Sequence, residues 1–186
     1  MTIEEVQTCF RALAPRERLI AKLAILAGMR PGEIVALTWG QISDHANIRQ
    51  RVYRGILDSP KTFQSERKAA LSIGLLRDLE AWKKEAIEVS ADAYVFPSER
   101  MTPLAMENVW RRNVSPKLKE VGLGWVNFQV MRRTSSTLLC ALGVEGKIVA
   151  DQLGHTLDVN QNVYTHSPVA IRQEALNRLE TALEQA

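Results

Sequence analysis

The chain has 186 residues, of which 46% are hydrophobic and 24% charged, and this composition predicts a globular protein large enough to bury a core. No apolar run approaches the roughly 18 residues that a membrane span requires, and the N-terminus MTIEEVQTCF carries acids where a secretory signal carries bases. We therefore expect a cytoplasmic protein; its net charge of +3 is too small to indicate a nucleic-acid partner by itself.

The first third of the chain predicts three helices. Thr2 and Glu5 form a capping-box pattern, so a helix is expected to begin at residue 2. A second helix runs through RERLIAKLAILAG to Gly28, and Pro31 begins a third over GEIVAL. Arg30 is therefore expected in a tight turn between two helices.

Beyond Trp39 the pattern changes from helical to extended. IRQRVYRGIL alternates and is rich in branched and aromatic residues, SPKTFQSE has turn chemistry, and RKAALSI resembles a returning strand. The segment predicts a small antiparallel sheet with Lys61 near a turn.

The rest of the chain is predicted to be largely helical. Helices are expected over residues 73–89, 103–120 and 129–142, over EGKIVADQL up to Gly154, and over residues 168–186. The predicted fold class is mainly α with a small antiparallel β-sheet (α+β), in a single domain spanning residues 1–186.

Basic residues are concentrated in two parts of the sequence. Between residues 46 and 70 they outnumber acids six to two, and a second cluster lies at residues 111–119. Such stripes suit a polyanion, although ordinary solvated surface explains either one as well. The DNA-binding candidates are Arg49, Arg51, Arg54, Arg67, Lys68, Arg111 and Arg112.

Neither a metal nor a cofactor is indicated. Cys9 and Cys140, the only cysteines, lie in apolar helical patterns without ligand-like spacing and are interpreted as packing residues. The chain also lacks the carboxylate cluster that two-metal nucleases use.

Four polar features can be explained together by chemistry at a phosphate. Arg30 lies in its turn, Gln129 and Arg132 share one face at a helix start, and His155 follows the helix-stopping Gly154. Tyr164 comes nine residues later in the polar stretch NQNVYTHS. Taken singly, each has a simpler explanation: an exposed loop arginine, an ordinary helix start, a histidine at a helix C-terminus and a surface tyrosine.

In order, the motifs AGMRPGE, PKT, QxxR, LGH and Tyr resemble the signature of the tyrosine recombinase family, also called phage-type integrases. The resemblance implies the family's catalytic-domain fold across essentially the whole chain. It covers the catalytic domain only, so we expect the N-terminal core-binding domain to be absent and the chain to be a fragment or a truncated member.

The resemblance also implies a site and a reaction. Tyr164 would attack the scissile phosphate to give a 3′-phosphotyrosyl link, with Arg30 and Arg132 as the phosphate clamp and His155 as a third donor. Lys61 would protonate the departing 5′-oxygen, with Lys68 as the alternative, and Glu33 would support an arginine from behind. The implied reaction needs no metal or cofactor.

One position departs from the family pattern, because Gln129 stands where a histidine is expected. Glutamine can hydrogen-bond a phosphate or orient Arg132, but it cannot exchange a proton. The phenol proton of Tyr164 would then pass to His155 or to water.

Three functions therefore remain open. The first is site-specific recombination by a phage, island or transposon integrase; the second is a catalytically silent DNA-binding relative; and the third is a type IB topoisomerase. The expected partner is double-stranded DNA in the nucleoid, with self-association into a tetramer in synapsis, or a monomer in isolation. The helix at 168–186 either packs on its own domain or is exchanged between protomers.

Overall fold

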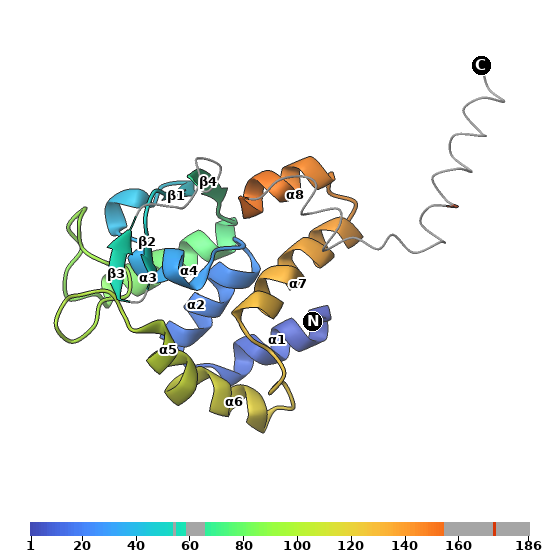
Figure 1. Cartoon of the computed structure of the whole chain (residues 1–186), viewed down its shortest axis with the longest axis horizontal. Coiled ribbons are helices and arrows are strands. Elements are labelled where there is room, and N and C mark those ends of the chain that lie inside the picture. Colours follow the sequence, from blue (N-terminus) through green and yellow to red (C-terminus); the bar gives the residue numbers. More distant parts are fainter. Residues whose placement is uncertain (54, 59–65, 155–172, 174–186) are drawn as a thin grey trace, which may run out of the picture.

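The computed structural model describes residues 1–53, 55–58, 66–154 and 173 (Figure 1). Of the predicted site residues, Lys61, His155 and Tyr164 lie outside these ranges, as do the DNA-binding candidate Arg54 and nearly all of the predicted helix 168–186.

Three helices open the chain, as predicted: α1 (Ile3–Ala12), α2 (Pro15–Ile25) and α3 (Pro31–Ala36). The capping box is present, because the Glu5 amide donates to Thr2 Oγ1 at 3.2 Å and the Thr2 amide donates to Glu5 Oε2 at 2.7 Å. Arg30 is the N-cap residue of α3, which places it in the turn where the sequence predicted it.

A 3-10 turn, η1 (Trp39–Gln41), leads into the antiparallel strands. β1 (His45–Ile48) pairs with β4 (Arg67–Ala70), with His45 opposite Ala70. β2 (Arg51–Tyr53) pairs with β3 (Ile56–Asp58), with Arg51 opposite Asp58.

The alternating run IRQRVYRGIL is divided between β1, β2 and β3. It breaks where the Gln50 side chain donates to the Ala36 carbonyl at 2.6 Å, and again at Gly55, whose φ of +78° makes a turn. RKAALSI does return antiparallel, but it pairs with β1 and not with the whole run.

The second half of the chain is helical. It contains α4 (Ile73–Lys84), α5 (Met106–Val109), the π-helical turn η3 (Trp110–Val114), α6 (Ser115–Glu120), α7 (Phe128–Ala141) and α8 (Gly146–Leu153). The predicted helix 103–120 thus begins later and changes its winding. The π-helical turn η3 lies just before Pro116, whose ring would clash with the carbonyl four residues earlier in a regular α-helix.

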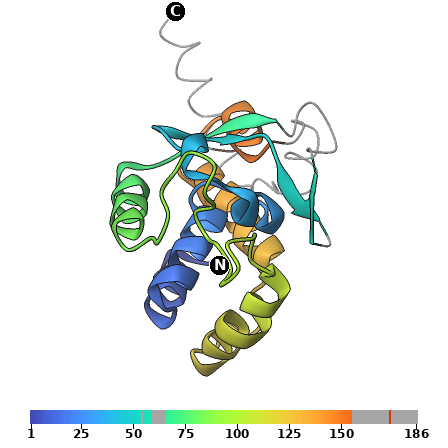
Figure 2. The same cartoon turned by 90° about the vertical axis from the view of Figure 1, so that its left-hand side faces the viewer.

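Helix α2 lies at the centre of the molecule and packs against α1, α3, α4 and α7 (Figures 1 and 2). Leu23 and Ala24 of α2 are fully buried, as are Met29 and Ile34 in the turn and helix that follow. The turn that carries Arg30 is therefore built on the core. The fold class predicted from the sequence is confirmed, and no helix within the described ranges is long and apolar enough to cross a membrane.

Helix α3 approaches strand β2 closely at Gly32. A Cβ atom at Gly32 would lie 2.4 Å from the carbonyl oxygen of Val52, which is a backbone atom and cannot turn aside. Only glycine allows this contact between α3 and the β2–β3 hairpin.

We predict that Gly32→Ala lowers the free energy of unfolding by about 1 to 3 kcal/mol, because the added methyl group overpacks the contact with Val52. Gly74→Ala is the matched control, since a Cβ at Gly74 meets nothing within 4 Å and alanine favours the helix α4. Urea denaturation measures both. A Gly32→Ala protein as stable as the Gly74→Ala protein would show that the contact does not form.

Candidate active site

The candidate site is organised around the C-terminal end of α8. Helix α8 stops at Gly154, which is left-handed with φ of +64° and directly precedes His155. The last carbonyls of a helix have no partner within it and carry partial negative charge. In α8, three of these carbonyl oxygens accept hydrogen bonds from arginine side chains of other elements. Arg67 Nε donates to Gln152 O at 3.0 Å, Arg132 Nη2 donates to Leu153 O, and Arg30 Nη2 donates to Gly154 O at 3.2 Å.

Arg132 joins α8 to the turn between α2 and α3. It lies in the first half of α7 and is only 8% exposed. Its Nη1 donates to the carbonyl of Gly28, while its Nη2 holds Leu153. Gly28 has φ of +63°, and a Cβ there would lie 2.2 Å from Leu153 Cδ2, so this turn and the end of α8 meet directly.

Arg30, at the end of the same turn, contacts the same end of α8. Its Nη1 donates to Glu33 Oε1 at 2.8 Å, and its backbone amide donates to Glu33 Oε2 at 2.8 Å. Its side chain remains 39% exposed, in contrast to that of Arg132. Arg30 is therefore held by its neighbours and still open to a ligand.

Glu33 is the anion inside this group of arginines. It is 4% exposed, and Arg67 grips both of its oxygens, with Nη1 to Oε1 and Nη2 to Oε2 each at 3.0 Å. Burial raises the pKa of Glu33, but the charge and hydrogen bonds of Arg67, together with those of Arg30, outweigh it and lower the pKa below its usual value. Glu33 thus contacts two arginines, Arg30 and Arg67.

Arg67 occupies a different place from the one predicted for it. The sequence put it in an exposed basic stripe, whereas its side chain is 6% exposed and turned inward onto Glu33 and α8. The burial pattern of β4 gives the reason: Arg67 shares the inward face of the strand with the buried Ala69, and Lys68 faces solvent.

The two predicted clamp arginines are neighbours in space. Arg30 and Arg132 bond to the carbonyls of consecutive residues, whose Cα atoms are about 3.8 Å apart. Two guanidinium groups 102 positions apart in the sequence are therefore brought to one helix end, where they concentrate positive charge beside the start of the segment that carries His155.

All the residues of this site lie in the part of the chain that matches a known family. Residues 1–170 match the model of the phage integrase family. The chain belongs to that family. It is 26% identical over 195 residues to the ICEBs1 integrase of Bacillus subtilis (strain 168), covering 94% of this chain and 52% of that protein, so it spans about half the length of the curated relative it matches.

Solved structures share the fold of this family member. An integrase of transposon Tn1549, in complex with transposon right end DNA, matches with a TM-score of 0.81 at 15% identity, over 97% of this chain and 65% of that one. The XerA recombinase matches with a TM-score of 0.75 at 19% identity, over 96% and 64%. The resemblance to tyrosine recombinases drawn from the sequence motifs is confirmed at the level of family and fold.

The position at which this phage integrase family member departs from the recombinase motif lies at the start of α7. Gln129 is exposed, whereas Arg132, one turn later, is buried. Among the described residues the Gln129 side chain makes no hydrogen bond, so its place in the site stays a prediction.

The remaining basic candidates lie outside the arginine group. Arg49, Lys68, Arg111 and Arg112 are exposed, the last two on the turn η3. Arg51 pairs with Asp58 across the β2–β3 hairpin at 3.0 Å. These four exposed cations remain candidates for contacts with DNA.

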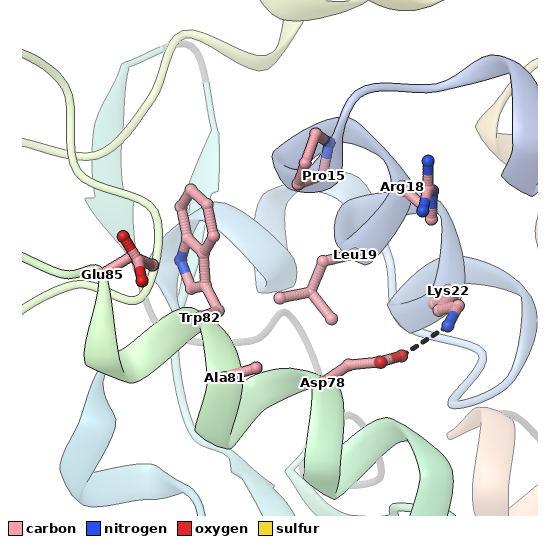
Figure 3. Close-up of a pocket in the computed structure, with 8 residues that line it drawn as sticks. All are labelled: Pro15, Arg18, Leu19, Lys22, Asp78, Ala81, Trp82 and Glu85. Atoms are coloured by element: carbon pink, nitrogen blue, oxygen red, sulfur yellow. Dashed lines mark hydrogen bonds and ion pairs between the residues drawn. The ribbon is translucent and has the colours of Figure 1, made fainter.

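Three further features of the described ranges concern metal ligands, cysteine and a pocket. No group of three or more His, Cys, Asp or Glu residues there could hold a metal ion. Cys9 is fully buried, and burial raises the pKa of its thiol to about 11, which makes it unreactive, as expected of a packing residue. A pocket between α2 and α4, lined by Leu19, Trp82 and the Lys22–Asp78 ion pair, includes none of the site arginines (Figure 3).

We predict that Glu33→Gln destabilises the protein by about 3 to 5 kcal/mol at pH 7, because it leaves the buried Arg67 cation without its carboxylate. The lowered pKa of Glu33 means that this stabilisation is fully present above the ordinary glutamate pKa of about 4.3 and is lost as the pH falls through the lowered value. Urea denaturation from pH 7 to pH 3 should therefore show the two proteins converging in acid. A stability difference that stayed constant over that range would contradict the assignment.

Proposed function

We propose that this chain breaks and rejoins DNA strands by transesterification, as the catalytic part of a site-specific recombinase. The observation that carries the proposal is the placement of Arg30 and Arg132 side by side at the end of α8, directly before His155. The planar fork of arginine matches two phosphate oxygens, and charge accumulates on the non-bridging oxygens in the transition state. A pair of guanidinium groups fixed in advance therefore stabilises that state without reorganisation.

Tyr164 is the proposed nucleophile. Its phenol oxygen attacks phosphorus, the bond from phosphorus to the 5′-oxygen breaks, and a 3′-phosphotyrosyl link and a free 5′-hydroxyl result. Attack by the 5′-hydroxyl of another strand reverses the step and releases the tyrosine. Because the phosphotyrosyl bond conserves the energy of the phosphodiester, the proposed route needs no metal or cofactor.

Two proton transfers accompany this exchange. Lys61, or Lys68 in its place, donates a proton to the departing 5′-oxygen, and His155 adds a third hydrogen bond to the phosphate. The phenol must lose its proton, which at pH 7 costs about 4 kcal/mol for an ordinary tyrosine pKa of about 10. Since Gln129 cannot accept a proton, His155 or water takes it.

Double-stranded DNA is the proposed substrate and partner. Exposed cations at Arg49, Lys68, Arg111 and Arg112 suit contacts with phosphates, and such contacts make binding fall steeply with added salt. Recombination joins two duplexes, so the proposal includes self-association on DNA, with the segment 168–186 either packing on its own domain or exchanged between protomers.

A catalytically silent DNA-binding protein is the second candidate, and the exposed Gln129 favours it because the usual proton-exchanging residue of the motif is missing. A type IB topoisomerase would use the same covalent chemistry, and relaxation of supercoils without strand exchange identifies it.

We predict that the wild-type chain forms a covalent adduct with a nicked suicide duplex. The small leaving fragment diffuses away with its 5′-hydroxyl, so the phosphotyrosyl link cannot be reversed and accumulates. Tyr164→Phe removes the nucleophile and abolishes the adduct, while Tyr53→Phe, at an exposed tyrosine on β2, leaves it unchanged. Denaturing gel electrophoresis detects the adduct, and binding to intact duplex serves as the control. DNA binding without any wild-type adduct would favour the silent DNA-binding protein.

A further inference from the structure

Arg67 has the geometry of a residue that acts through the site and not directly on a ligand. Its two terminal nitrogens hold both oxygens of Glu33, and its Nε holds the carbonyl of Gln152. Its aliphatic part crosses the end of α8, where a Cβ at Gly154 would lie 2.6 Å from Arg67 Cδ. One side chain thus contacts the carboxylate that supports Arg30 and the helix end that precedes His155.

The charges around Glu33 show what this contact does. Each oxygen of Glu33 is shared: Oε1 accepts from the guanidinium groups of Arg30 and Arg67, and Oε2 accepts from the Arg30 amide and from Arg67. With a single cation beside it, the carboxylate would neutralise Arg30. With two cations, the group keeps one net positive charge, and Arg30 is the more exposed of the two arginines, at 39% against 6%.

The strand that carries Arg67 is fastened to α8 at a second point. The Gln152 side chain pairs with the backbone of Ala70, accepting from its amide at 3.0 Å and donating to its carbonyl at 3.0 Å. Gln152 also donates to the carbonyl of Ala27, next to Gly28. Strand β4, the turn before α3 and the end of α8 are therefore locked together, which fixes the position from which Arg67 reaches Glu33.

We infer that Arg67 is a positioning residue for the proposed reaction: it offsets the charge of Glu33 so that the charge of Arg30 remains available to a phosphate, and it holds the end of α8. The inference rests on the proposed function for its consequence in catalysis, but not for its consequence in anion binding. Lysine could supply the charge, but it lacks the planar fork that meets both oxygens of Glu33 and the Nε that meets Gln152.

The test is a double-mutant cycle of Arg67→Gln and Glu33→Gln, with adduct formation measured at saturating suicide duplex. Arg67→Gln should slow the adduct on the order of tenfold, less than the hundredfold or more expected for loss of a direct phosphate donor. In the Glu33→Gln background the same change should cost clearly less, because the charge to be offset is gone and only the contact with Gln152 remains to be lost. Arg67→Lys should recover only part of the rate, because lysine supplies the charge but not the contacts with both Glu33 oxygens and Gln152.

Arg16→Gln is the matched control. Arg16 also pairs with a buried glutamate, Glu17, at 2.7 Å, but it lies at the opposite end of α2 from the site. It should leave the rate within about twofold of the wild type, and thermal unfolding confirms that every variant folds. A wild-type rate in Arg67→Gln, or an equal loss with and without Glu33, would overturn the inference.

A second readout does not need cleavage. Inorganic phosphate titrated into the DNA-free chain should shift the Arg30 Nε–Hε NMR signal, and Arg67→Gln should weaken that binding several-fold, with recovery in the double variant. If the wild type forms no adduct but this pattern appears, the proposed function fails and the inference stands. Equal phosphate affinity in the wild type and in Arg67→Gln would overturn the inference whatever the outcome of the cleavage assay.

Discussion

The geometry of the site depends on how the C-terminal end of α8 is satisfied. A helix end leaves carbonyl oxygens without partners, and here the carbonyls of residues 152 to 154 accept from Arg67, Arg132 and Arg30 in turn. Because these arginines come from β4, α7 and the turn before α3, one helix end fixes three distant parts of the chain relative to one another. The same bonds hold cationic groups in a fixed arrangement beside the segment that begins at His155.

Burying this much positive charge requires a compensating anion, and Glu33 provides it. The carboxylate is almost inaccessible, keeps a lowered pKa and binds both Arg30 and Arg67, so it stabilises the group without neutralising it. Gly28 and Gly154 allow the close approach, because each adopts a left-handed conformation where a side chain would collide with Leu153 or Arg67. Packing, charge and backbone conformation therefore all favour the same arrangement of the arginines.

Much of this could be predicted from the sequence where the cause was local. The Thr2 cap, the Arg30 turn between Gly28 and Pro31, and the stop of α8 at Gly154 follow from neighbouring residues. The role of Arg67 did not, because charge clustering does not separate a buried arginine from a solvated one; its alternation with Ala69 was the available signal. The strand run divides at Gln50, whose side chain donates to the carbonyl of Ala36 in α3, and alternation along the sequence does not contain such a tertiary contact.

A crystal structure with tungstate would show whether the arginines at the end of α8 form a phosphate site. Tungstate resembles phosphate in shape and charge, and its anomalous signal locates it independently of the protein. We expect the ion between the guanidinium groups of Arg30 and Arg132, with the Arg67–Glu33 pair intact. Tungstate bound only at the exposed cluster around Arg111 and Arg112, with Arg30 and Arg132 turned away from each other, would contradict it.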